Sequence, residues 1–192
     1  VPDAERVYQL GQSFLLGRNF EDAIVYFRAA LAKNDIHLNA RLSLGDALLQ
    51  MGKFNEAVVE LEKAYILDKD ETRLPLARAL LTKARAYEQN NETEALAACE
   101  RVLEISPNEK GAKEIHATIW TRRGDVAIKR NDLRAALAAY RQAGNKERET
   151  QVVEQRRKAE LAGERAKLDA MIKSEQFEQA QALIIELKGK YP

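Results

Sequence analysis

Apolar positions recur along this chain in five short segments that share one spacing. In each segment a small residue is followed four positions later by a larger apolar residue, and three positions after that by a small or apolar residue. Spacings of four and three place all of these positions on one face of an α-helix. The pattern therefore predicts five amphipathic helices. Their first small residues, the marker alanines, are Ala23, Ala57, Ala95, Ala136 and Ala180.

A second helix is predicted before each of these five. Gly11, Gly45 and Gly124 each lie twelve residues before a marker alanine. Turn-forming residues such as those at Gly17 and Gly52 separate the two helices of a pair. Each pair is therefore expected to form a helical hairpin. An apolar residue just before the second helix would pack back on it as a staple, and the candidates are Phe20, Phe54, Leu133 and Phe177.

The distance between marker alanines grows along the chain, in steps of 34, 38, 41 and 44 residues. The excess over the first step corresponds to about one, two and nearly three helical turns at 3.6 residues per turn. We therefore predict first helices that lengthen toward the C-terminus, with Gly144 and Asn145 stopping one helix and starting the last. We expect the highly charged start of the last one to project into solvent. The predicted long helices are Thr72–Asn90, Asn108–Lys129 and Lys146–Lys173.

Composition supports a folded helical chain. Apolar residues make up 45% and charged residues 32% of the sequence, with only four prolines and nine glycines. No apolar run approaches the ~20 residues that span a bilayer. The net charge is +1, and the basic residues of the C-terminal third are interspersed with acidic ones, which does not indicate nucleic-acid binding. The chain lacks an initiator Met, so we expect a fragment of a larger regulatory or assembly protein, located in the cytoplasm.

Catalytic and metal-binding motifs are absent from the sequence. His37 and His116 lie far apart, and neither belongs to a His-Glu-x-x-His pattern. The single cysteine, Cys99, forms no Cys-rich metal site and is expected to be a buried small residue rather than a reactive thiol. Trp120 is expected in the core. We predict no enzymatic activity, no cofactor and no metal.

The hairpin pattern resembles the tetratricopeptide repeat, whose signature runs W-x2-L-G-x2-Y, then A-x3-F, then P. Leu10, Gly11 and Phe14 match the L-G-x2-Y run of the first hairpin, and Leu44, Gly45 and Leu48 match that of the second. The remaining matches are Trp120, Gly124, Pro107 and Pro192. The resemblance covers about residues 4–192 and implies an all-α, right-handed solenoid of about five hairpins in a single domain. Its units would be about 4–37, 38–75, 76–109, 110–145 and 146–192.

Two hairpins depart from the family pattern at the glycine position. Lys83 or Ala84 stands there in the third hairpin, and Leu168 stands there in the fifth. A side chain as large as leucine predicts looser or altered packing between the two helices of the fifth hairpin.

The resemblance also implies a function, that of a protein-interaction scaffold. First helices of such repeats line a concave face on which a partner protein or peptide lies. Some relatives grip a terminal carboxylate with a Lys/Asn/Arg clamp, but the matching positions here are Tyr8, Gln12 and Ser43, which disfavours that ligand. The register assigns twelve partner-binding positions: Tyr8, Gln12, Leu15, Leu42, Asp46, Leu49, Gln50, Arg85, Asp125, Lys129, Asp169 and Lys173.

Three aspartates of this set recur at one register position, and they allow two interpretations. Asp46, Asp125 and Asp169 could form a partly acidic groove for a basic or amide-rich segment. Alternatively, Asp125 and Asp169 pair with Lys129 and Lys173, each four residues later on the same helix.

Two other functions remain open as alternatives. The long last helix could pair with a copy of itself, as a structural self-associating module with a weak seam of small residues. RNA binding is disfavoured, because the basic third lacks the aromatic platforms on which bases stack. The self-association seam would comprise Val152, Ala159, Ala162 and Ala166.

Overall fold

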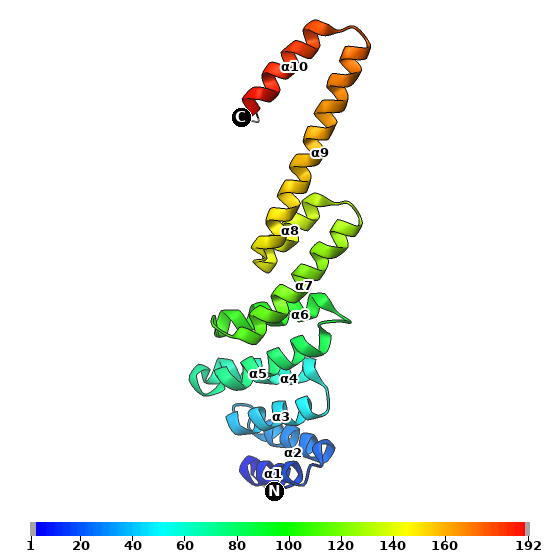
Figure 1. Ribbon diagram of the computed structural model, residues 1–192. Helices are drawn as coiled ribbons and strands as arrows, with labels where there is room; N and C mark the ends of the chain where they lie inside the picture. Colours follow the sequence, from blue (N-terminus) through cyan, green and yellow to red (C-terminus); the bar gives the residue numbers. More distant parts are fainter. Residues whose placement is uncertain (1–2, 191–192) are drawn as a thin grey trace. The chain divides into compact units, whose positions relative to one another are not determined.

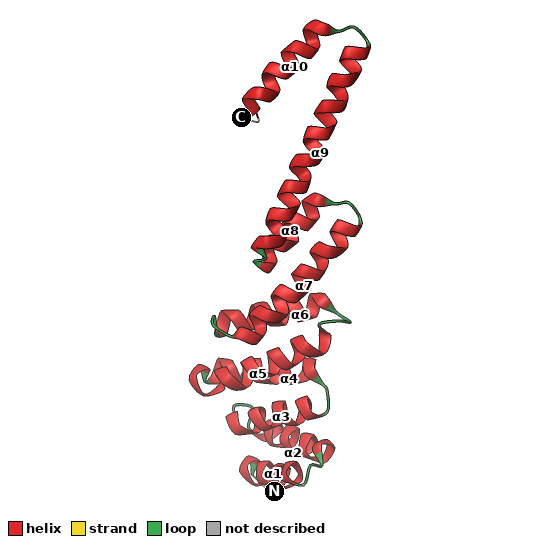
Figure 2. Cartoon of the chain, viewed as in Figure 1, coloured by secondary structure: helices red, strands yellow, loops and turns green. Residues whose placement is uncertain are grey.

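The computed structural model describes residues 3–190, and throughout this part the chain forms helices joined by short loops (Figures 1 and 2). Helices α1 and α2, α3 and α4, α5 and α6, and α9 and α10 contact each other as hairpins. The predicted all-α repeat of helical hairpins is confirmed. The helices are α1 (Ala4–Leu16), α2 (Phe20–Lys33), α3 (Leu38–Gln50), α4 (Phe54–Leu67), α5 (Lys69–Tyr87), α6 (Glu92–Ile105), α7 (Lys110–Lys129), α8 (Leu133–Ala143), α9 (Lys146–Lys173) and α10 (Phe177–Lys190).

The first helices lengthen as predicted, from 13 residues in α1 and α3 to 19 in α5, 20 in α7 and 28 in α9. The bounds of α9 agree with the prediction, whereas those of α5 and the start of α7 were predicted wrongly. Helix α5 begins earlier because the Asp68 side chain accepts hydrogen bonds from the amides of Asp70 and Glu71 and so caps it there. Helix α7 begins later because a turn, closed by the Glu109 amide on the Ser106 carbonyl, precedes it.

Polar side chains cap most of the helix N-termini and thereby fix where the chain turns. Between α8 and α9, Gly144 adopts a left-handed conformation with φ of 67°, which glycine tolerates without strain, and Asn145 caps α9. The predicted stop and restart at these two residues is confirmed. The caps whose side chains accept a helix amide are Asp3, Asn19, His37, Asp68, Asn91, Asp132 and Asn145.

The chain divides into two compact units between Ile119 and Trp120. Unit 1 contains α1 to α6 and the first half of α7. Unit 2 contains the second half of α7 together with α8, α9 and α10. The five-unit boundaries drawn from the sequence stay a prediction.

The core of unit 1 is formed where each hairpin packs on the next. Phe27 of α2 is fully buried and shares a cluster with Leu44 and Leu48 of α3. A Cβ at Gly11 would lie 2.7 Å from the Phe27 ring, and one at Gly45 would lie 2.6 Å from the Leu61 side chain. Glycine therefore lets each first helix approach the large residue of its own second helix.

The same arrangement recurs in the first hairpin of unit 2. A Cβ at Gly124 would lie 2.4 Å from the Tyr140 ring, and Tyr140 is buried together with Val152 of α9. The start of α9 therefore packs on α8 instead of projecting into solvent. The proposed self-association seam was also wrong at Val152, because this side chain is already buried inside the chain at 3% exposure.

The third and fifth hairpins depart from the glycine pattern in different ways. In the third, Ala84 and Cys99 are both fully buried, so a smaller residue on α6 compensates for the larger one on α5. Lys83 instead pairs with Glu94 at 2.6 Å. In the fifth, Leu168 is half-buried and Ile184 is 38% exposed.

The five marker alanines are buried, as the periodicity required, since none is more than 4% exposed. The predicted staples Phe20, Phe54 and Leu133 are half-buried. Phe177 is 62% exposed, so the staple prediction fails in the last hairpin. Trp120, expected in the core, is half-buried with the Arg123 guanidinium 4.8 Å from its ring centre.

Candidate protein-binding groove

A groove on unit 1 lies along three successive first helices. Helix α3 contacts both α1 and α5, so one surface runs across all three (Figure 1). The groove has a volume of about 680 Å³. Its lining contains four of the predicted partner-binding positions, Leu15, Asp46, Leu49 and Gln50, together with Arg18, Phe20, Arg78 and Thr82.

An ion pair lies in the lining of this groove. The Arg78 guanidinium of α5 donates a hydrogen bond of 2.5 Å to the Asp46 carboxylate of α3. Both side chains remain about half exposed, at 64% and 47%. The recurring aspartate of the second hairpin is thus neutralised by an arginine of the third. Because Arg18 also lines the groove, its cationic side chains outnumber its single carboxylate.

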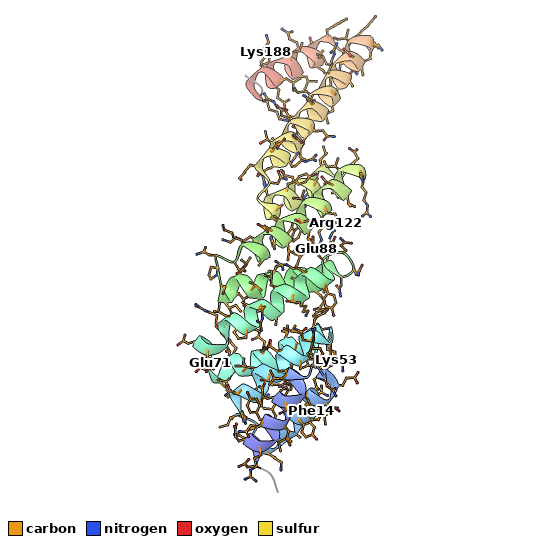
Figure 3. The ribbon with its side chains drawn as sticks, turned by 60° about the horizontal axis from the view of Figure 1, so that its bottom comes forward. Phe14, Lys53, Glu71, Glu88, Arg122 and Lys188 are labelled. Atoms are coloured by element: carbon orange, nitrogen blue, oxygen red, sulfur yellow. The ribbon has the colours of Figure 1, made fainter. Side chains whose placement is uncertain are left out.

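A polar network holds the N-terminal residues of the predicted set. The Gln12 side-chain amide donates to the Tyr8 hydroxyl and to the Ser43 hydroxyl, both at 2.6 Å. The Tyr8 ring packs against His37, with 4.9 Å between ring centres. Tyr8 and Gln12 are therefore ordered by neighbours from α3 and from the loop before it. Phe14, labelled in Figure 3, stacks on Tyr26 at 5.0 Å on the same hairpin.

Two predicted positions of unit 1 lie outside the lining of the groove. Leu42 is half-buried on α3. Arg85 is exposed in the last turn of α5, where its guanidinium would be 3.4 Å from a Cβ added at Gly111. Arg85 therefore lies beside the start of α7.

The four predicted positions of unit 2 are Asp125, Lys129, Asp169 and Lys173. The Tyr140 hydroxyl donates to Asp125 at 2.7 Å, so this carboxylate serves the packing of α8 on α7. Lys129, Asp169 and Lys173 are exposed. Neither predicted aspartate–lysine pair forms an ion pair in the described part of the chain. The interpretation that Asp125 and Asp169 pair with the lysines four residues later is therefore wrong.

Sequence reasoning missed four lining residues, Arg18, Phe20, Arg78 and Thr82. The register of the third hairpin was taken from the position that replaces glycine, which selected Arg85. Helix α5 starts at Lys69, well before that position, and its earlier turns bring Arg78 and Thr82 to Asp46 instead. The spacing of four between Arg78 and Thr82, which puts both on one helix face, was the available signal.

Two titratable groups outside the groove, Cys99 and His116, have pKa values shifted by burial. Burial raises the pKa of the Cys99 thiol to about 11, and nearby Glu88 adds to this effect, so the thiol stays protonated near neutral pH. Burial lowers the pKa of His116. Within residues 3–190, no three His, Cys, Asp or Glu side chains are grouped so that they could hold a metal ion. No helix in that range has the length and apolar character that a membrane crossing needs.

These features define a helical-hairpin repeat protein with a groove lined largely by its first helices. The family model of the tetratricopeptide repeat matches residues 8–73, which include the first two hairpins. This segment therefore carries the tetratricopeptide repeat pattern, and the resemblance read from the sequence is confirmed there. Such repeats are a general protein–protein interaction module and are in general not catalytic.

Known proteins show similarity of limited extent. A STIP1 homolog of Dictyostelium discoideum is 29% identical over 101 residues, which is 52% of this chain and 17% of that protein. The chain thus spans less than a fifth of this relative's length. The tetratricopeptide repeat domain of Arabidopsis OM64 aligns with 62% of this chain and 95% of its own, at a TM-score of 0.44 and 22% identity. A thermophilic tetratricopeptide repeat protein of Thermus thermophilus aligns with 98% and 92%, at a TM-score of 0.41 and 19% identity.

Proposed function

We propose that the groove of unit 1 binds an extended segment of a partner protein. The observation that carries this proposal is the convergence of three first helices on one groove of about 680 Å³. A segment lying there would cross α1, α3 and α5 and could contact side chains from three hairpins at once. Such a site recognises length and sequence together, because each hairpin supplies its own contacts.

The lining offers both apolar and polar contacts to such a segment. Leu15, Phe20 and Leu49 are half-buried, so part of each apolar side chain is free to be covered by a ligand. Gln50 and Thr82 provide hydrogen-bonding groups beside them. This mixture fits a peptide whose side chains alternate between apolar and polar, because the apolar contacts provide affinity and the polar ones provide specificity.

The Asp46–Arg78 pair sets the electrostatic character of the groove. The guanidinium of Arg78 has further N–H groups beyond the one that Asp46 accepts. With Arg18 it gives the groove a positive balance, which opposes the basic ligand inferred from the aspartates alone. Tyr8 and Gln12 extend the proposed surface along α1. Leu42, Arg85 and the four positions of unit 2 stay predictions, as does the cytoplasmic location.

Photo-crosslinking followed by affinity measurement tests the groove. A photoreactive residue at position 49 should crosslink a partner that the same residue at position 66, on α4, does not. The purified partner should then bind the Leu49→Glu variant at least ~10-fold more weakly. The matched control is Ile66→Glu, because Ile66 is 78% exposed and does not line the groove. Equal affinity of both variants would remove the groove as the binding site.

A further inference from the structure

A second pocket of unit 1 lies beside the groove, where α5 meets the loop that precedes α7. Its volume is about 380 Å³, which falls within the range of ~300–1,000 Å³ that ligand pockets occupy. Arg78 lines both this pocket and the groove, so the two are neighbours that share one side chain. We call it the α5 pocket, and its other lining residues are Leu74, Pro75, Ala77, Leu81, Ser106 and Glu109.

The α5 pocket offers an apolar wall to a ligand. Leu74, Ala77 and Leu81 follow one another at spacings of three and four, which places them on one face of α5. Leu74 is 69% exposed although α5 has neighbours on both sides. Helix α3 contacts α5 on one side, and on the other a Cβ added at Gly111 of α7 would lie 3.1 Å from Leu81. An apolar ligand side chain that covers Leu74 would therefore remove apolar surface from water.

The charges of the groove and of the α5 pocket favour different ligand groups. In the groove, Arg18 and Arg78 face one carboxylate, Asp46, so a ligand carboxylate would equalise the charges. Arg78 can bind it, because a guanidinium has five N–H donors and only one of its nitrogen atoms donates to Asp46. In the α5 pocket, Glu109 accepts a hydrogen bond of 3.3 Å from the Gly111 amide and would repel an acidic ligand residue.

The distance between neighbouring helices sets the spacing of these ligand groups. Packed helices lie about 8–10 Å apart, and an extended segment advances about 3.3 Å per residue. About three residues therefore lead from Arg78 across α5 to the α5 pocket. About three residues in the opposite direction lead across α3 to Leu15 and Leu49, the apolar lining of the groove.

We propose that the partner segment crosses α5 and carries an acidic residue on Arg78, with an apolar residue about three positions away on each side. One of these apolar residues occupies the α5 pocket and the other contacts Leu15 and Leu49. This inference rests on the proposed function, because it specifies the ligand of the same groove. The carboxylate belongs to a side chain inside the segment, so this recognition differs from the binding of a chain terminus.

Selection from a random peptide library displayed on phage provides the probe peptides. The wild-type chain is the bait, and peptides that also bind the Leu49→Glu variant are removed. The enriched peptides should contain Asp or Glu with Leu, Ile or Phe about three positions away on both sides. Because this pattern reads the same in both chain directions, the result does not depend on the orientation of the bound segment. Fluorescence anisotropy of one enriched peptide then gives its Kd for each variant.

A charge exchange tests the contact with Arg78. Arg78→Glu should weaken the enriched peptide at least ~10-fold, because two carboxylates then face the ligand carboxylate. A peptide with Lys in place of its acidic residue should bind this variant at least ~10-fold more tightly than the original peptide does. Arg73→Glu is the matched control, because Arg73 is exposed on the same helix and lines neither the groove nor the α5 pocket. The control should leave the Kd unchanged.

A second substitution tests the α5 pocket. Leu74→Ser should weaken the enriched peptide at least ~5-fold, because it removes the most exposed apolar side chain of the pocket wall. Replacing each apolar peptide residue by Ala in turn should identify one whose loss makes the wild type and Leu74→Ser bind alike. Ile66→Ser is the matched control, because Ile66 is 78% exposed on α4 and lies outside the pocket.

The possible failures separate this inference from the proposed function. If no peptide prefers the wild type to Leu49→Glu, the groove is not a binding site and the inference is wrong with it. If peptides bind the groove but Arg78→Glu does not exchange the preference for acid against Lys, the inference alone is wrong. The same follows if Leu74→Ser and Ile66→Ser have equal effects. Circular dichroism checks that the helices remain, as expected because Arg78 and Leu74 are both mostly exposed.

Discussion

The second and the fifth hairpins use the same sequence pattern but bury it to different extents. Around Leu61, which is 1% exposed, the glycine on the first helix admits a large side chain from the second. The fifth hairpin has Leu168 in place of the glycine, and its Ile184 remains 38% exposed. The marker alanines are buried in both hairpins, so their burial reflects only the contact between the two helices of a hairpin.

The two hairpins differ in whether a further helix packs on them. Helix α5 packs on α4, whereas α10 is the last helix that the structure describes and contacts α9. The large residue of the repeat signature thus reports the contact between hairpins, and it is buried only where a neighbour covers it. Residues that occupy the same position of the repeat but differ in burial therefore test this interpretation.

The largest expected contrast is in thiol accessibility. Cys99 and Ile184 occupy the same position of their hairpins, but Cys99 is fully buried and its pKa is raised to about 11. At low chain concentration and pH 8, an Ile184→Cys variant should be alkylated at position 184 at least ~1,000-fold faster than at Cys99, which reacts only after local opening. Mass spectrometry of the digested protein measures both rates in one sample. Similar rates would mean that the third hairpin is as open as the fifth.

Side-chain truncation should show the next largest contrast. Phe27→Ala should destabilise unit 1 by about 4 kcal/mol, because it leaves a cavity beneath α3. Ile184→Ala should destabilise unit 2 by about 1 kcal/mol or less, because its side chain is partly in water already. Urea unfolding followed by circular dichroism gives the free energies, and hydrogen exchange assigns them to helices. A large effect of Ile184→Ala would contradict the 38% exposure of this side chain.

Much of the fold was predictable because hairpin packing depends on local periodicity. The alanine spacing located the second helices, and the growing distance between alanines gave the lengths of the first ones, α9 to the residue. The start of α5 was missed because it depends on one capping side chain, Asp68, whose role competes with that of other polar residues nearby.

The groove was predictable only in part, because its lining combines helices of unequal length. Leu15, Asp46, Leu49 and Gln50 were found from the register shared by α1 and α3, which have equal lengths. The longer α5 has no glycine to fix its register, so Arg78 was missed and Arg85 was chosen. A periodic sequence pattern does not show whether a neighbouring helix packs over a given residue, which is why Phe177 was expected to pack as Phe20 does.

Glycine replacement tests the close approach between helices directly. Gly45→Leu should destabilise unit 1 by about 3 kcal/mol, since a Cβ there already lies 2.6 Å from Leu61. Gly163→Leu on α9 is the matched control, because a Cβ at Gly163 meets no atom within 4 Å. The control should stabilise its helix by about 0.5 kcal/mol through better helix propensity. Urea midpoints measure both, and a neutral Gly45→Leu would show that the hairpin opens as readily as the fifth one does.

The smallest effect concerns Tyr140. It lies in unit 2, as Ile184 does, and occupies the same position of its hairpin, but it is buried. Burial, followed by the hydrogen bond to Asp125, raises the pKa of the Tyr140 hydroxyl to about 12 from its ordinary value of about 10. The neutral hydroxyl therefore stabilises the folded state fully below pH 10. This contribution is lost between pH 10 and 12, where the unfolded chain ionises and the folded one does not.

Tyr140→Phe should accordingly be about 1 kcal/mol less stable than the wild type at neutral pH, because Asp125 loses its donor. The difference between the two proteins should shrink as the pH rises from 10 to 12. Tyrosinate absorbance of the wild type should show one of the six tyrosines ionising after the others, and this late step should vanish in the variant. If all tyrosines ionised together near pH 10, the cover that Val152 provides over Tyr140 would be no better than that over Ile184, and the contrast between covered and open hairpins would fail within unit 2 itself.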